Sequence, residues 1–242
     1  MKLTRSISFV MTAAALAGSV GCKPSPTSAA AAQTEEGRPC GPEAVIEDGE
    51  DNNNQVIVQD GRNGYIYTFA DHEGSTITPQ SGELGGTFSQ SPGGANGSGF
   101  AARMTGKVAT AEIVYVGMGF NLTDPKEQYD ASKYKGLAFY AKKGPNSTSK
   151  VRLKVPDVNT DPDGGICGAC YNDFGKDLIL TEEWQKFTIP FDDMRQMPGW
   201  GSPRPSGITP SKLYAIQFQV NDKGKDYDIW VDDLQFTGCP GK

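Results

Sequence analysis

Histidine is almost absent from this sequence: His72 is the only one. A Ser-His-Asp triad could therefore use only that residue, and no GxSxG, HExxH or phosphate-loop motif occurs. Glycoside hydrolysis needs only a pair of carboxylates, and the 29 acidic residues leave that chemistry open. The sequence thus contains no recognisable catalytic motif, but it does not exclude a polysaccharide-cleaving enzyme.

Positive charge is also in short supply. The chain has 23 Lys and Arg residues against 29 Asp and Glu residues, a formal net charge of −6. Nucleic acids and anionic membrane surfaces are bound by clustered basic residues, so we expect neither kind of partner. Helical periodicity is missing too, apart from one or two possible turns at 191–197. Thirty Gly and sixteen Pro residues instead indicate many turns.

Residues 1–21 have the pattern of an export signal. Lys2 and Arg5 precede an apolar run, ISFVMTAAALAGSV, of about 14 residues. A membrane-spanning helix needs roughly 20 apolar residues, so this run is too short to be one. The segment SVGC, which ends at Cys22, resembles the lipobox of bacterial lipoproteins. The resemblance implies a lipidated Cys22 as the mature N-terminus; an ordinary secretory signal is the alternative.

A lipid on Cys22 would place the protein in the cell envelope. Residues 22–39 are rich in Pro, Ser, Ala and Thr and have no apolar period, which predicts a flexible tether. Lys23, rather than Asp, follows the cysteine, which favours the outer membrane if the source is Gram-negative. Residues 40–242 then form one domain, which we expect to be monomeric.

Four cysteines remain after Cys22. An even number in an exported chain favours disulfides. Cys40 and Cys239 bracket the domain, so a bond between them would tie its two ends together. Cys167 and Cys170 form a CGAC loop, which we interpret as a local structural disulfide. A redox pair or half of a zinc site is the alternative, but there is no second CxxC motif.

Short runs with a period of two residues, separated by turns, predict an all-β fold: an antiparallel β-sandwich. In several runs the apolar residues alternate with polar or aromatic ones, as in Val151-Arg-Leu-Lys-Val155 and Ile216-Gln-Phe-Gln-Val220. The predicted strands are 43–47, 55–59, 64–69, 100–107, 111–121, 136–142, 150–156, 176–180, 185–190, 213–220 and 227–236.

The side chains opposite the predicted core face suit a sugar ligand. Aromatic rings stack on the C–H faces of pyranoses, and the forked groups of Gln and Arg bond neighbouring hydroxyls. The alternative is that they are only the solvated face of an antiparallel sheet. The candidate substrate-binding residues are Tyr115, Tyr140, Arg152, Lys154, Gln217 and Gln219, with Tyr67 as a further possibility.

Two loops could border such a site. The segment 157–171 is long, acidic and rich in glycine, and it could line a binding site or hold a cation. The segment MPGWGSPRP (197–205) places Trp200 between two glycines. A tryptophan there could stack on a ligand or pin the loop to the sandwich, and we expect the second.

Several segments, taken in order, resemble the galactose-binding-like jelly rolls, in particular carbohydrate-binding modules of family 11. They are VIEDGED (45–51), GRNGYIYTF (61–69), YDASKYKGLAFYA (129–141), WQKFTIPF (184–191) and 213–236, which closes on DIWVDDL. The resemblance implies a sandwich that binds a polysaccharide, often a β-glucan. It also implies a structural Ca²⁺, with Glu50 and Asp232 or Asp233 as ligands.

The sequence therefore favours a lipid-anchored jelly roll that binds a β-glucan-like polysaccharide without catalysis. Two other functions stay open. One is a glycoside hydrolase or lyase on the same scaffold, and the other is a structural or adhesive surface protein.

Overall fold

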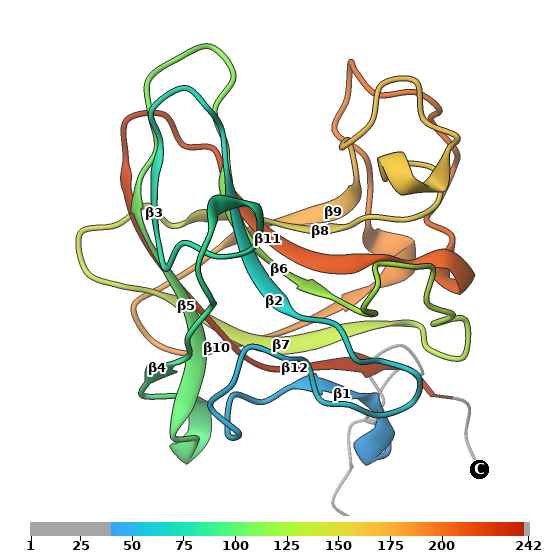
Figure 1. Cartoon of the computed structure of the whole chain (residues 1–242), viewed down its shortest axis with the longest axis horizontal. Coiled ribbons are helices and arrows are strands. Elements are labelled where there is room, and N and C mark those ends of the chain that lie inside the picture. The colour runs from blue at the N-terminus through green and yellow to red at the C-terminus, as the bar shows by residue number, and fades with distance from the viewer. Residues whose placement is uncertain (1–39, 240–242) are drawn as a thin grey trace, which may run out of the picture. The chain divides into compact units, whose positions relative to one another are not determined.

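The computed structural model describes residues 40–239, which form two antiparallel sheets packed face to face (Figure 1). The predicted signal, Cys22 and the tether lie outside the described residues. Sheet one has the order β10 (Gln185–Pro190), β7 (Gly136–Lys143), β12 (Asp226–Thr237), β5 (Phe100–Lys107) and β3 (Thr76–Thr78). β1 (Val45–Glu47) pairs with β12, and β4 (Ser91–Pro92) pairs with β5.

The second sheet has five strands. Their order is β2 (Ile66–Ala70), β6 (Val116–Asn121), β11 (Ala215–Val220), β8 (Lys150–Val155) and β9 (Phe174–Ile179). A single 3-10 turn, Pro42–Ala44, precedes β1. Five more lie between later strands: Gly82–Leu84, Ala95–Gly97, Pro162–Gly164, Phe191–Asp193 and Pro210–Lys212. Within residues 40–239 no helix has the length and apolarity needed to cross a membrane.

This architecture confirms the predicted all-β sandwich. The strands at 100–107 and 185–190 have the predicted bounds, and most others differ by a few residues. The prediction at 55–59 is wrong, because that segment makes only isolated bridges through Gln55 and Gln59. β3 and β4 are too short to show a period and were not predicted. The expected turns at 191–197 reduce to one 3-10 turn.

Alternate residues of both sheets fill the space between them. In β11, Ile216, Phe218 and Val220 are fully buried, whereas the two glutamines between them are half-buried. The Phe218 ring meets Phe120 of its own sheet and Phe139 of the opposite sheet edge to face, with centroids 6.2 and 5.0 Å apart. The period of two therefore separates core from surface as the sequence predicts.

Both predicted disulfides are present. Cys40 and Cys239 are joined across a separation of 199 residues, and Cys167 is joined to Cys170. The first bond ties the segment that leads into β1 to the one that follows β12. The second bond closes the tip of a loop, as the structural interpretation of the CGAC segment predicts.

Arg62 is a charged side chain with no exposed surface. Its Nη2 donates to the carbonyls of Glu43 and Val45 at 2.7 and 2.8 Å, and its Nη1 donates to the Tyr129 hydroxyl at 2.7 Å. Asp60 lies 3.4 Å from the guanidinium. These bonds hold the start of the domain against the loop that precedes β2.

Replacing Arg62 should cost much more stability than replacing Lys133, although both cations contact Asp60. Arg62→Met removes three short bonds, to the carbonyls of Glu43 and Val45 and to the Tyr129 hydroxyl, and takes from Asp60 its buried cationic partner. We expect the free energy of unfolding to fall by about 3 kcal/mol. Lys133 is about half exposed, so Lys133→Met should cost under about 1 kcal/mol. Urea unfolding of the two variants measures both values, and equal losses would contradict this account.

Candidate functional site

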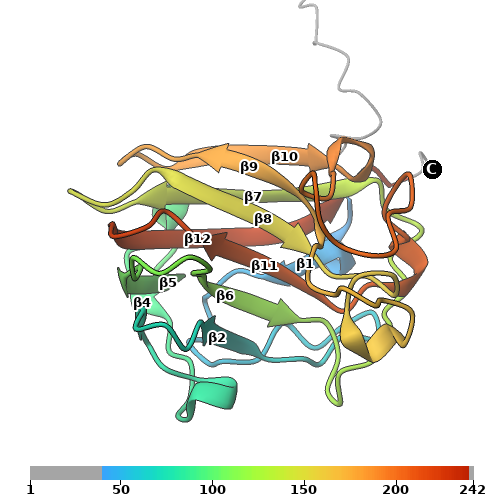
Figure 2. The same cartoon turned by 90° about the horizontal axis from the view of Figure 1, so that it is seen from above.

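The outward side chains of the five-stranded sheet, here called the open face, lie in two rows fixed by strand register. Figure 2 shows these strands from above, with β2 and β9 at opposite margins. Each row crosses all five strands in the order β2, β6, β11, β8 and β9. The first row is Tyr67, Gly119, Gln217, Lys154 and Gly175, and the second is Phe69, Gly117, Gln219, Arg152 and Asp177.

Two glycines of β6 make room for aromatic rings. A Cβ atom on Gly119 would collide with the ring of Tyr67, and one on Gly117 would collide with the ring of Phe69. The two rings of β2 therefore lie over the neighbouring strand. Their centroids are 6.1 Å apart, and the ring of Tyr115, 6.3 Å from Phe69, continues the series. We call Tyr67, Phe69 and Tyr115 the aromatic stripe.

Polar side chains run beside the aromatic stripe. Gln217 Nε2 donates to the Tyr67 hydroxyl at 2.7 Å, and Lys154 Nζ donates to Gln219 Oε1 at 3.1 Å. Burial raises the pKa of Tyr67 to about 12, so its hydroxyl stays protonated. Gln217, Gln219, Lys154 and Arg152 form what we call the polar stripe.

Both cations of the polar stripe are paired with acids. Lys154 Nζ lies 3.0 Å from Asp173 Oδ2, and the two side chains are only 8% and 2% exposed. Arg152 donates to Asp177 Oδ1 at 2.8 Å at the surface. Asp173 Oδ1 is buried and has no hydrogen-bond partner in the described structure. The open face is thus close to neutral, because each of its cations is paired with an acid.

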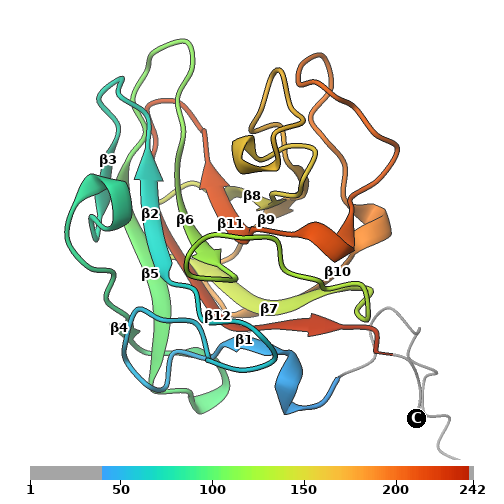
Figure 3. The same ribbon diagram turned by 45° about the vertical axis from the view of Figure 1, so that its right-hand side comes forward.

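Two loop segments, 157–173 and 195–209, rise together at one end of the open face (Figures 1 and 3). We call them the loop wall. They are joined by a bridge between Ala169 and Ser202. Lys126 ties a third loop to the wall through Asp161 and Asp163, at 2.8 and 3.0 Å. Two acids of segment 157–171 are thus paired with a lysine, and the third, Asp157, accepts from Asn159, Thr160 and the backbone of Thr209.

The structure brings six of the seven predicted binding residues onto one face. Tyr67, Arg152, Lys154, Gln217 and Gln219 belong to the two rows, and Tyr115 is 37% exposed beside them. Tyr140 does not join them: it lies on β7 of the other sheet.

Tyr140 faces outward on sheet one, where Lys186 Nζ lies 5.8 Å from its ring centroid. Alternation along a strand predicts which side a residue faces but not which sheet it belongs to. The placement of Tyr140 with the other six was wrong for that reason.

The predicted calcium ligands lie at the opposite side of the sandwich. Glu50 Oε1 accepts from Ser98 Oγ at 2.7 Å and from the backbone of Gly99 and Phe100 at 2.7 and 3.1 Å. These bonds already hold the loop that precedes β5. Asp232 Oδ2 accepts from the backbone of Ala95 at 2.7 Å, and burial raises the Asp232 pKa to about 6.

Glu47, next to these residues, fits a cation better than Glu50. Its Oε1 accepts from Gly49 N and from Gln90 Nε2, whereas Glu47 Oε2 and Gln90 Oε1 are buried without partners. Burial raises the Glu47 pKa to about 8. Within residues 40–239 no three acidic, His or Cys side chains form a metal-binding group, so amide and backbone oxygens would have to complete a calcium shell.

Asp233 differs from Asp232. It has a left-handed backbone with φ of 50°, where the register between β12 and β7 shifts. Burial raises the pKa of Asp233 above its usual range, and the charges of Asp48 and Glu50 add to that effect.

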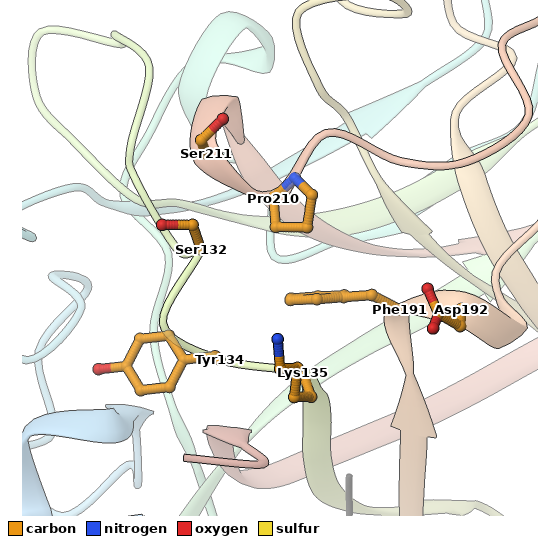
Figure 4. A pocket seen from close by; sticks show the side chains of 7 residues that line it. All are labelled: Ser132, Tyr134, Lys135, Phe191, Asp192, Pro210 and Ser211. Atoms are coloured by element: carbon orange, nitrogen blue, oxygen red, sulfur yellow. The ribbon is translucent and has the colours of Figure 1, made fainter. Parts of the chain in front are cut away.

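Two shallow cavities lie outside the open face. One of about 300 Å³ has the ring of Phe191 between Pro210 and Lys135, with serine hydroxyls at its rim (Figure 4). Another of about 340 Å³ is lined by Lys126 and Tyr214 near the loop wall. The open face carries more aromatic and amide side chains, the kinds that bind sugars, than either cavity does.

Sequence reasoning missed three residues that matter here. Phe69 shares the alternation of Tyr65 and Tyr67, so the period of two could have found it. Asp173 ends an irregular loop, and its pairing with Lys154 has no local signal. Glu47 stands in an acidic segment in which only its burial distinguishes it from its neighbours.

Two solved structures similar to this fold are carbohydrate-binding modules. The family 11 module of the cellulosomal cellulase Lic26A-Cel5E of Clostridium thermocellum is 16% identical, with a TM-score of 0.56 over 82% of this chain and 95% of that one. The family 30 module of Cel9D-Cel44B from the same organism is 15% identical, with a TM-score of 0.51 over 77% and 94%. A search of curated proteins found no match.

The model of the family described as "Carbohydrate binding domain 30" matches residues 65–238, from the start of β2 to the end of β12. The match covers more than half of the chain. It runs through every strand of the open face. The chain therefore belongs to the carbohydrate-binding modules of family 30.

Proposed function

We propose that the open face binds a polysaccharide of the β-glucan type and does so without catalysis. The observation that carries this proposal is the aromatic stripe lying directly beside the polar stripe. Flat rings can stack on the C–H faces of successive sugar units. The amides and cations beside them can bond hydroxyls at the edge of the same chain.

The similarity to a solved complex supports the type of glycan. A family 11 module from Clostridium thermocellum was solved with a β-1,3-1,4-mixed-linked tetrasaccharide, and this chain matches it with a TM-score of 0.53 at 15% identity. The near neutrality of the open face also suits an uncharged glucan, since neither cation is free to attract an anionic chain.

Removing either stripe should weaken binding to mixed-linked β-glucan. We expect Phe69→Ala, Tyr115→Ala and Gln217→Ala each to lower affinity about tenfold, the loss expected when a central contact of about 1.4 kcal/mol is removed. Tyr140→Ala is the matched control, because Tyr140 is an outward tyrosine on the other sheet. Affinity electrophoresis against β-glucans, mannans and peptidoglycan measures these effects.

Three outcomes would refute the proposed function. One is that no glycan in the panel retards the wild-type protein, and another is that Tyr140→Ala weakens binding as much as Tyr115→Ala. The third is the release of reducing ends from the same panel, which would identify a hydrolase in place of a binding module.

We propose that lipid on Cys22 holds this module at the cell envelope. The short apolar run before Cys22 and the Pro/Ser/Ala-rich segment after it support the proposal. In a Gram-negative source the expected address is the outer membrane.

The proposed anchor can be tested by labelling. Cells that express the full chain should incorporate labelled palmitate into it, and the protein should sediment with membranes. Cys22→Ser should abolish both, whereas Cys167→Ser, in the same chain, should retain both. Soluble export of the unmodified wild-type chain would contradict the anchor.

We also propose a structural Ca²⁺ held by Glu47, Gln90 and Asp232 with neighbouring backbone carbonyls. The two orphaned oxygens of Glu47 and Gln90 support this set. A cation would supply the opposite charge that the buried Glu47 carboxylate lacks. Glu50 and Asp233, the other acids expected from sequence, are then neighbours of the site.

Calcium should raise the stability of the wild-type protein. At a calcium concentration about a hundred times the dissociation constant, the gain is roughly 2.7 kcal/mol, seen as a melting temperature that falls when EDTA is added. Glu47→Gln should remove this response, and Glu50→Gln should keep it. A melting temperature that EDTA leaves unchanged rules out the site. If only Glu50→Gln loses the response, the ligand is Glu50, as predicted from the sequence, and not Glu47.

A further inference from the structure

Trp200 is exposed although the backbone that carries it is tightly held. Its side chain is 49% exposed, contrary to the expectation that it packs against the sandwich. The flanking glycines, Gly199 and Gly201, have φ of 89° and 87°, a left-handed conformation that residues with a side chain rarely adopt. The loop thus turns sharply on both sides of the tryptophan and presents it at the surface.

A buried asparagine fixes this turn. Asn172 Nδ2 donates to the carbonyls of Trp200 and Met197 at 2.6 and 2.9 Å, and its Oδ1 accepts from Met197 N at 2.8 Å. A Cβ atom on Gly201 would collide with the Asn172 side chain. Arg204 Nη1 gives the Trp200 carbonyl a second donor at 3.2 Å. The indole is therefore presented by a preorganised loop.

The same asparagine connects Trp200 to the open face. Asn172 directly precedes Asp173, the buried partner of Lys154 in the polar stripe. On its other side is Tyr171, which is 64% exposed and has a φ of 70°. Asn172 thus connects two exposed aromatic residues: Tyr171 precedes it in the chain, and Trp200 is bonded to it through its backbone carbonyl.

A second attachment holds the tip of the loop wall. The Cys167–Cys170 disulfide closes the CGAC segment. Gly168 N donates to the Ser202 carbonyl at 2.9 Å, and Ser202 N donates to the Ala169 carbonyl at 3.1 Å. Ser202 lies two residues after Trp200, so the disulfide-closed tip supports the tryptophan loop.

We infer that Trp200 is an outer binding subsite, where a sugar unit stacks after the chain has passed the Lys154–Asp173 pair. An exposed indole on a fixed loop loses little conformational freedom when a ligand binds, which favours affinity. This inference rests on the proposed function and adds a dependence on chain length. A short oligosaccharide occupies the two stripes only, and a longer one also reaches Trp200.

Calorimetry of the full chain with mixed-linked β-glucan oligosaccharides, from a trisaccharide to an octasaccharide, tests the subsite. We expect Trp200→Ala to lower affinity for the octasaccharide about tenfold and to leave the trisaccharide unchanged. Trp200→Phe should recover part of the loss, since a ring remains. Trp184→Ala, a tryptophan of the other sheet, is the matched control and should match wild type at both lengths.

The results separate this inference from the proposed function. If Phe69→Ala weakens every oligosaccharide but Trp200→Ala weakens none, the polysaccharide site stands and the outer subsite is wrong. Equal losses at all lengths for Trp200→Ala also overturn it, because they would place Trp200 within the main site or indicate damage to it. If no oligosaccharide or polymer binds wild type, both ideas fall together.

Discussion

The arrangement of the open face depends on two positions without a side chain, Gly117 and Gly119 in β6. Any side chain at either position would lift the ring of Phe69 or Tyr67 off the strand. Glycine weakens a strand interior, so its presence in the middle of a sheet needs a compensating reason. Here the reason is contact: with the rings lying over β6, the Tyr67 hydroxyl reaches Gln217 on the strand beyond.

Buried charge is the second constraint on this face. Removing Lys154 and Asp173 from water is costly, and the cost is offset only while each retains its partner and further hydrogen bonds. Lys154 has both Asp173 and Gln219, whereas one oxygen of Asp173 has nothing. Lys154 is therefore held by two partners, and its bond to Gln219 fixes that amide on the open face.

The sequence predicted the sandwich and most of the open face because these follow from alternation along each strand. Both disulfides followed from the even number of cysteines and from their positions, at the two ends of the domain and within one short loop. Alternation along a strand gave the outward positions of Arg152, Lys154, Gln217 and Gln219. Alternation does not say which strands are neighbours, and Tyr140 was misplaced for that reason. Partners supplied by irregular segments, such as Asp173 and Gln90, depend on how loops fold back, for which a single sequence contains no periodic signal.

The fastened ends of the domain and the open face lie on different sheets. Sheet one carries β1 and β12, the Cys40–Cys239 bond and the contacts of Arg62, so the ends of the domain are fastened on that side. The open face belongs to the other sheet, and its loop wall rises away from β1 (Figure 3). The proposed tether would therefore join the domain on the side away from the proposed glycan site. The aromatic stripe, the polar stripe and Trp200 would stay free to meet a polysaccharide.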